Sequence, residues 1–216
     1  MSEILRPRLV VIAGPNGSGK TFATENLIGH TWGGGCEYVN PDFIARDEFG
    51  GWNSREAFLK AAEKAKGLRE RCLADRRDLM FETVFSTPGK VEFVKRAQVS
   101  GFFVRLFFIC TDSPSINAAR IVERYLQGGH VVPIDKIVDR YGKSIANCAV
   151  AATFVDRAYV YDNSVNGEAP RLLFKTIEGR VSKVYEEGPI NEWACNIFNV
   201  LERAQGVRED HCPPRP

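Results

Sequence analysis

The chain has 216 residues, of which 44% are hydrophobic and 26% charged, and its formal net charge is +2. This length suits one α/β domain with a substantial core, and so small a net charge gives no sign of a nucleic-acid binder. No window approaches about 18 apolar residues, and residues 1–8 lack a long apolar run after their charges, so we expect neither a membrane span nor a secretory signal.

The first predicted elements are a buried strand at residues 9–13 and a helix at residues 21–27, joined by a glycine-rich loop. The loop matches G-x-x-x-x-G-K-[ST], the phosphate-binding motif, which requires a strand before it and a helix after it. Its backbone N–H groups can curl around an anion, and the helix dipole adds positive potential. We predict that the phosphates of ATP or GTP bind here. The loop residues are Gly14, Pro15, Asn16, Gly17, Ser18, Gly19, Lys20 and Thr21.

Two side chains of this loop have distinct predicted roles. Lys20 would reach the β- and γ-phosphates, and the hydroxyl of Thr21 would ligate Mg²⁺. The alternative is a glycine turn that joins a strand to a helix without binding anything, and the matching flanks favour the phosphate loop over it.

A short strand at 37–39 comes next, and Asn40 can cap the following helix with Pro41 at its first position. Asp42 then lies in the first helical turn. Near a bound nucleotide, its carboxylate could accept the proton of a substrate hydroxyl and aim that hydroxyl at the γ-phosphate, a task of positioning more than of basicity. The helix dipole alone also favours Asp at this position. Given the phosphate loop, we predict the catalytic role.

A helix at 54–73 leads to a third strand at 79–82. Glu82 ends that strand, and an acid there can hold Mg²⁺ through water or contact the substrate. Asp112, after the fourth strand, is the rival metal carboxylate. Because the Asp-Ser-Pro sequence that it begins is also good helix-capping chemistry, we favour Glu82.

Strands and helices alternate along the chain, which predicts an α/β fold with a P-loop kinase-like parallel sheet of about five strands and helices on both faces. In such folds ligands lie beyond the carboxyl ends of the strands. The elements not yet given are a helix from 88, a strand at 102–110, helices at 114–126 and 133–154, a strand at 158–162, a hairpin at 170–185 and a helix at 190–204.

The third group of candidate residues is cationic. Arg120 and Arg124 are four residues apart, so they share one helical face. Lys136, Arg140 and Lys143 repeat this pattern in the next helix. Arginines placed over ATP would neutralise charge on the transferring phosphoryl group, and we expect Arg120 to contact the nucleotide itself.

The segment Gly128-Gly129-His130 separates the two cationic helices and suits a mobile corner. We predict that residues from about 115 to 145 form an arginine-bearing lid that closes over ATP and excludes water. A solvated basic helix face is the alternative, which the phosphate loop makes the weaker interpretation. His130 could touch a phosphate but is better explained as a turn residue.

The whole of residues 1–205 is predicted to form a single domain, closed by the hairpin and the last helix, with a flexible tail at 206–216. The six cysteines are scattered without C-x-x-C spacing, and two of them fall in apolar segments. We therefore expect six reduced thiols in a cytoplasmic protein, with no disulfide frame or zinc site. The cysteines are Cys36, Cys72, Cys110, Cys148, Cys195 and Cys212.

Taken in order, several motifs resemble those of the zeta-toxin-like P-loop kinases, in particular their small Gly-Gly-His branch. The resemblance spans about residues 8–165, and its arginine and Gly-Gly-His block is more specific than the phosphate loop. The motifs are the loop at 14–21, Asn40-Pro41-Asp42, Phe81-Glu82-Thr83, Arg124-Tyr125, Gly128-Gly129-His130, Val132-Pro133, Arg140-Tyr141, Ser144 and Tyr161-Asp162-Asn163-Ser164.

Characterised zeta toxins phosphorylate a sugar hydroxyl of UDP-N-acetylglucosamine, and a cognate antitoxin restrains them. The resemblance implies that Lys20 binds the nucleotide, that Asp42 is the base, and that Glu82 contacts metal or substrate. It makes Arg124 and Arg140 the phosphate-stabilising lid arginines. The chain departs from the branch at residues 142–143, where Gly-Lys stands in place of a common arginine and lacks its bidentate fork.

Three functions stay open at this point. The first is a kinase of a UDP-sugar that acts as a toxin, with ATP and Mg²⁺ as cofactors and a proteinaceous antitoxin as partner. The second is a kinase of another hydroxyl acceptor, such as a nucleoside, an antibiotic or a ribonucleotide end. The third is a nucleotide-binding switch without an acceptor. No membrane and no nucleic-acid partner is expected.

Overall fold

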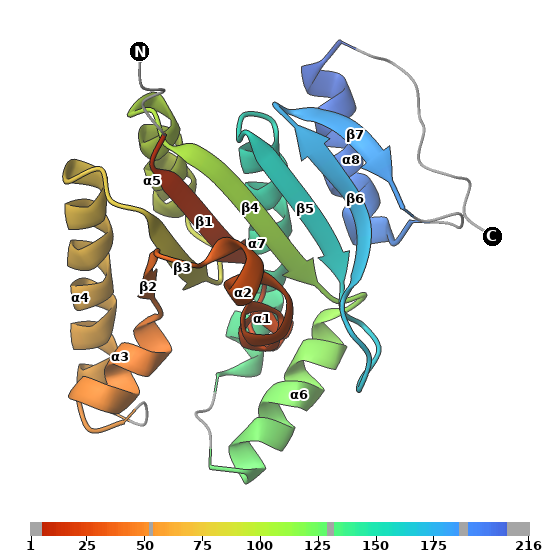
Figure 1. Cartoon of the computed structure of the whole chain (residues 1–216). Helices are drawn as coiled ribbons and strands as arrows, with labels where there is room; N and C mark the ends of the chain where they lie inside the picture. The colour runs from red at the N-terminus through yellow and green to blue at the C-terminus, as the bar shows by residue number, and fades with distance from the viewer. Residues whose placement is uncertain (1–5, 52–53, 129–131, 186–189, 207–216) are drawn as a thin grey trace.

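The computed structural model describes residues 6–51, 54–128, 132–185 and 190–206. Seven strands form one sheet in the order β2-β3-β1-β4-β5-β6-β7 (Figure 1). The α/β fold predicted from the sequence is therefore confirmed. The strands are β1 (Arg8–Ala13), β2 (Glu37–Val39), β3 (Leu79–Thr83), β4 (Phe103–Cys110), β5 (Arg157–Asp162), β6 (Arg171–Ile177) and β7 (Arg180–Val184).

The five strands expected from the sequence make up the parallel part of the sheet. The C-terminal hairpin, β6 and β7, extends the same sheet by pairing antiparallel to β5. Its apolar residues explain this placement: Leu173 and Phe174 are fully buried, and the ring of Phe174 packs edge-on against Phe198 at 5.5 Å. The sheet thus has seven strands where about five were expected, because the hairpin adds two.

The helices begin where the capping residues predict. The side chain of Asn40 accepts a hydrogen bond from the backbone N–H of Asp42 at 2.9 Å, and Ser54 accepts one from Ala57 at 3.3 Å. The helices are α1 (Lys20–Ala23), η1 (Thr24–Ile28), α2 (Gly29–Trp32), α3 (Pro41–Glu48), α4 (Arg55–Ala74), α5 (Pro88–Val99), α6 (Pro114–Leu126), α7 (Ile134–Ala152) and α8 (Glu192–Ala204).

The helix after the glycine loop is not uniformly α-helical, because η1 is a π-helical turn. The Thr24 hydroxyl donates to the carbonyl of Lys20 at 3.0 Å and so competes for an oxygen of the helical ladder. A Glu82 carboxylate oxygen lies 2.8 Å from the same hydroxyl, so the two acceptors share its one proton. Such π-turns occur often at functional sites, and this one begins directly behind the loop.

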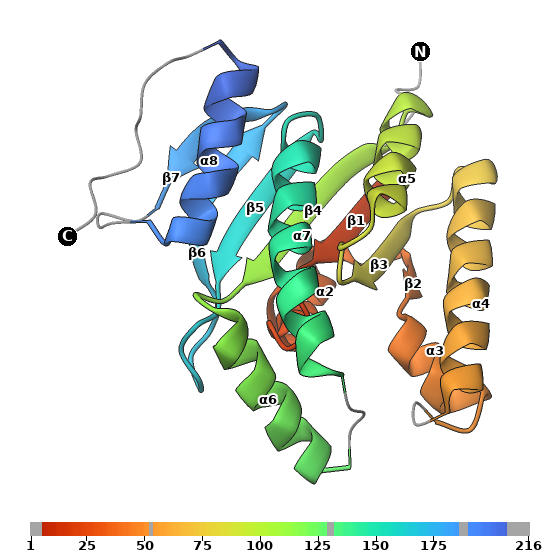
Figure 2. The same cartoon turned by 180° about the vertical axis from the view of Figure 1, so that it is seen from behind.

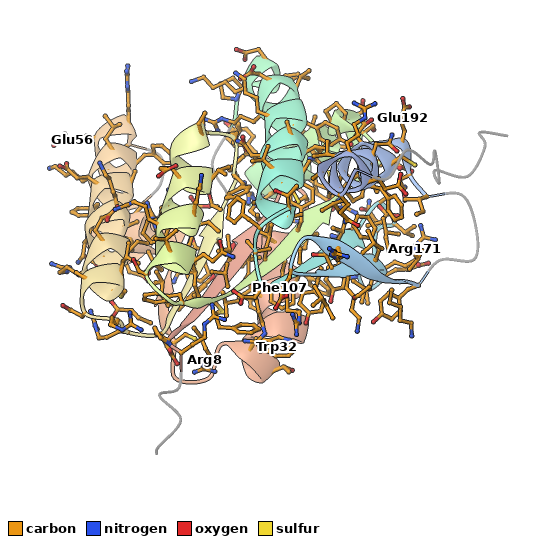
Figure 3. The ribbon with its side chains drawn as sticks, turned by 90° about the horizontal axis from the view of Figure 1, so that it is seen from above. Arg8, Trp32, Glu56, Phe107, Arg171 and Glu192 are labelled. Carbon is orange, nitrogen blue, oxygen red and sulfur yellow. The ribbon has the colours of Figure 1, made fainter. Side chains whose placement is uncertain are left out.

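The two faces of the sheet are covered unequally. Helices α4, α5, α7 and α8 cover one face (Figure 2), whereas the short α1–η1–α2 segment lies on the other (Figure 1). On that second face Trp32 packs toward Phe107, with ring centroids 6.3 Å apart (Figure 3). Helices α3 and α6 extend beyond the carboxyl ends of the strands and flank the glycine loop (Figure 1).

The cysteines correct one expectation. Cys110 and Cys148 are fully buried and free, as predicted for small core residues, and Cys36 and Cys72 are also free. Cys195 is disulfide-bonded, so the prediction of six reduced thiols is wrong, because a pairing without recognisable spacing cannot be read from sequence. Cys212 lies outside the described residues. The cytoplasmic location loses this support and stays a prediction.

No helix within the described segments has both the length and the apolar character needed to cross a bilayer.

Candidate active site

A cavity of about 690 Å³ lies at the carboxyl end of the sheet, between the glycine loop, the starts of α3 and α4, and the helices α6 and α7. It brings together most of the site residues predicted from the sequence, while Gly14, Pro15 and Ser18 are buried in the loop behind it. The predicted residues that line the cavity are Asn16, Gly17, Gly19, Lys20, Thr21, Asp42, Glu82, Arg120, Arg124 and Arg140.

The glycine loop is held in shape by its neighbours. Gly17 and Gly19 have φ angles of +77° and +87°, which side chains disfavour. A Cβ on Gly17 would also lie 2.5 Å from the carbonyl oxygen of Asn117, and one on Gly19 would lie 2.2 Å from the side-chain amide of Asn163. That amide donates to the carbonyl of Ser18 at 2.8 Å. The sequence analysis named Asn163 only as part of a motif in the family resemblance, and it did not name Asn117.

Lys20 is held inside the loop, where its ammonium donates to the carbonyl of Pro15 at 2.8 Å. Burial lowers the pKa of Lys20 to about 8, although the nearby carboxylates of Glu82 and Asp42 oppose that shift. The ammonium therefore lacks full compensation for its lost hydration. A phosphate in the cavity would supply the missing negative charge.

Glu82 is buried at the end of β3 and accepts three hydroxyl hydrogen bonds. They come from Thr21 at 3.1 Å, Thr24 at 2.8 Å and Tyr38 at 2.5 Å. Burial and the Glu82 charge raise the pKa of Tyr38, which keeps this phenol a donor. Neither Thr24 nor Tyr38 belongs to a recognisable motif, so the sequence did not reveal this network.

The pair formed by Thr21 and Glu82 suits a magnesium ion, because both offer the oxygen atoms that Mg²⁺ prefers. The described residues contain no cluster of three or more His, Cys, Asp or Glu that could hold a metal. An ion here would therefore take its remaining ligands from phosphates and water. The rival, Asp112, lies elsewhere: it lines a second cavity against α8, where its carboxylate accepts a bond from Asn191.

Asp42 lies in the first turn of α3 on the cavity wall. Its backbone N–H is bonded to Asn40, whose amide donates to the Tyr38 hydroxyl at 3.1 Å. Through that hydroxyl, the segment carrying Asp42 is tied to Glu82. Within the described residues no donor is bonded to the Asp42 carboxylate, which leaves both of its oxygens available to a substrate hydroxyl.

The cationic residues of α6 and α7 behave differently from one another. Arg140 reaches the loop and donates to the side chain of Asn16 at 3.4 Å. Arg124 is exposed at the cavity, and its charge contributes to the lowered pKa of Lys20. Lys136 also lines the cavity. Lys143 instead pairs with Asp139 at 2.7 Å and is not among the lining residues.

Arg120 is held by the loop that follows β5. Its guanidinium donates to the carbonyl of Asn163 at 2.8 Å and to the side chain of Asn166 at 2.7 Å. These bonds tie α6 to the same asparagine that supports the glycine loop. The contact of Arg120 with a nucleotide stays a prediction, as does the lid, and His130 lies outside the described residues.

The start of α4 forms a cavity wall that the sequence did not predict. Ser54, Arg55 and Phe58 line the cavity there, next to Asp42 and Pro41. The signal was present in Arg55, because the helix dipole disfavours a cation at the first helical position. The sequence analysis did not recognise Arg55 as a site residue, because its place on the cavity wall depends on how α3 and α4 pack beside the loop.

Comparison with known proteins gives the following matches. Residues 1–168 match the sequence model of the zeta toxin family. An uncharacterised protein of Haemophilus influenzae is 28% identical over 138 residues, which are 64% of this chain and 95% of that protein.

Two solved structures share the fold. The AvrRxo1-ORF1:-ORF2 complex with ATP has a TM-score of 0.65 at 15% identity, covering 100% of this chain and 67% of the other. The PezAT chromosomal toxin–antitoxin system of Streptococcus pneumoniae has a TM-score of 0.57 at 14% identity, covering 95% and 88%. At such identities these two likenesses show the fold alone.

Proposed function

The chain belongs to the zeta toxin family and is a P-loop kinase, and we propose that it transfers the γ-phosphoryl group of ATP to a sugar hydroxyl of a UDP-sugar such as UDP-N-acetylglucosamine. One observation carries the proposal: Lys20, Thr21, Glu82 and Asp42 line a single cavity. A loop suited to phosphates thus faces the same space as a carboxylate that has no bonded donor among the described residues, which is what transfer to a hydroxyl needs.

In this proposal the residues on the two sides of the cavity have different roles. The loop and Lys20 hold the phosphates, while Thr21 and Glu82 would hold Mg²⁺, which neutralises charge on the phosphate oxygens when it is bound. Asp42 accepts the proton of the acceptor hydroxyl. Arg124 and Arg140 approach from the side of the predicted lid and stabilise the charge on the phosphoryl group during its transfer.

The start of α4 supports an anionic acceptor. Arg55 is exposed on the cavity wall and has no carboxylate partner within the described residues. One turn further, Phe58 is 43% exposed. A cation for a diphosphate and a ring for a planar base or sugar are the groups that a UDP-sugar would require.

The acceptor is tested by steady-state kinetics with ATP and a panel of UDP-sugars, nucleosides and aminoglycoside antibiotics. We expect turnover with a UDP-sugar, and we expect Arg55→Ala to raise its KM about tenfold while the KM for ATP stays unchanged. The matched control is Arg71→Ala, an exposed arginine on the same helix outside the cavity. Turnover of a nucleoside or an antibiotic with none of any UDP-sugar would refute the proposed acceptor.

The lid arginines give a second prediction. Arg140→Ala and Arg124→Ala should each lower kcat by about 10²- to 10³-fold, the usual cost of one lost donor to the charge that develops during transfer. Lys143→Ala, on the same helix as Arg140 but paired with Asp139, should leave kcat unchanged. Full kcat in either arginine variant would exclude that residue from the lid function.

We also propose that a proteinaceous antitoxin restrains the kinase. The support is family membership together with the shared fold of PezAT, which is a toxin–antitoxin system. Expression of the chain alone should then arrest growth, and co-expression with the gene that neighbours its own should relieve that arrest.

A further inference from the structure

Part of one sheet face has no helix over it. The α1–η1–α2 segment covers apolar residues of β1, β3 and β4 and reaches β5, where Trp32 packs against Tyr159 with ring centroids 6.4 Å apart. No described helix lies over β6 and β7 on that side (Figures 1 and 3). These two strands are antiparallel, and antiparallel strands commonly leave one face to solvent. The charges that this face carries decide what it could bind.

This face is cationic. On β4 to β7, the residues that alternate onto it include five lysines and arginines, and none of the described residues that these strands present there is acidic. No ion pair with a carboxylate involves any of the five within the described part of the chain. We call these residues the basic face: Arg105, Arg157, Lys175, Arg180 and Lys183.

Four of these cations form like-charged pairs across neighbouring strands. Arg105 lies directly opposite Arg157 in the parallel pair of β4 and β5, and Lys175 lies directly opposite Lys183 in the hairpin. Like charges in directly opposite positions destabilise a sheet. Within the fold, the first pair is offset in part by stacking, because the Arg105 guanidinium lies over the rings of Trp32 and Phe103 at 4.3 and 4.5 Å. For Lys175 and Lys183, an anionic partner would remove the repulsion.

The aromatic residues of the face decide between kinds of anion. Phe103 has the guanidinium groups of Arg105 and Arg157 over it at 4.5 and 5.7 Å, and Tyr159 is stacked on Phe107 at 4.8 Å. Nucleic-acid bases need free ring faces on which to stack, and these faces are already occupied. Carboxylates need only the cations, and a surface rich in Tyr and Arg is typical of protein interfaces.

We propose that the basic face is a docking surface for an acidic segment of a partner protein, whose carboxylates pair with these cations. None of its five cations lines the active-site cavity. The proposal therefore does not rest on the kinase function, and its failure would leave that function untouched.

The test is fluorescence anisotropy with a labelled peptide of about 20 residues in which Glu and Asp alternate with Tyr and Leu, at about 50 mM salt. We expect the peptide to bind and Lys175→Glu or Lys183→Glu to weaken it at least tenfold. Lys95→Glu, an exposed residue of α5 on the opposite face, should leave binding unchanged. No binding to the wild-type chain, or equal binding to all variants, would overturn the proposal.

Three further measurements separate docking from other causes. Lys175→Glu places an opposite charge across from Lys183, so its melting temperature should equal or exceed that of the wild type while peptide binding falls. A drop in melting temperature that accounts for the lost binding would overturn the proposal. So would equal affinity for the Gln and Asn version of the peptide, or tighter binding of a single-stranded oligonucleotide of matched length.

Discussion

Asp42→Asn should keep ATP binding and lose phosphoryl transfer by about 10³-fold, within the range that a positioned base contributes. The substitution preserves size and removes the only group proposed to accept the hydroxyl proton. The bond between Asn40 and the backbone N–H of residue 42 does not involve the carboxylate, so the start of α3 should stay intact. Transfer is measured as kcat with saturating acceptor, and ATP binding by calorimetry.

The matched control is Asp47→Asn. Asp47 lies on the same helix, is exposed and pairs with Arg46 at 2.6 Å outside the cavity, so its loss should leave kcat near normal. Near-normal transfer by Asp42→Asn would show that the base lies elsewhere.

Lys20→Ala should lower kcat/KM by about 10³-fold or more, because the β- and γ-phosphates lose their fixed positive charge. The fold should persist, since within the described residues the ammonium bonds only to the carbonyl of Pro15 in the loop itself. Far-ultraviolet circular dichroism checks the fold, and initial rates at several ATP concentrations check the effect.

The pH dependence of ATP binding tests the same lysine independently. Because the pKa of Lys20 is lowered to about 8, its charge is present below pH 8 and is lost as the pH rises above it. A bound phosphate favours the charged form, so ATP affinity should be highest below pH 8 and should fall at higher pH. Lys20→Arg stays charged and should bind with little dependence on pH. Equal pH profiles for the two proteins would contradict this account of Lys20.

The parts of the molecule that local sequence dictates were predictable. The loop at 14–21 carries its own strand, glycines and helix start, and the caps at Asn40 and Ser54 set the starts of α3 and α4 through bonds spanning two or three residues. Glu82 was preferred to Asp112 because it ends a strand beside the loop, whereas Asp112 begins a helix-capping sequence. The structure places Glu82 beside Thr21 and Asp112 in another cavity.

What the sequence did not reveal depends on contacts between distant segments. The hairpin looked like a separate addition, because its pairing with β5 is set by the burial of Leu173 and Phe174. The bond from Asn163 to the glycine loop joins residues 145 positions apart. The basic face is equally invisible in sequence, since Arg105 on β4 and Lys183 on β7 share one face only in the finished sheet.

The central claim is that this cavity transfers the γ-phosphoryl group of ATP to a hydroxyl and not to water. The most direct measurement incubates the intact chain with Mg-ATP and UDP-N-acetylglucosamine and compares, by mass spectrometry and phosphate assay, the phosphorylated acceptor formed with the free phosphate released. The account predicts that acceptor product accounts for nearly all the ATP consumed and that it requires Mg²⁺. ATP consumed entirely as free phosphate, with no phosphorylated acceptor for this or any other hydroxyl compound tried, would contradict it.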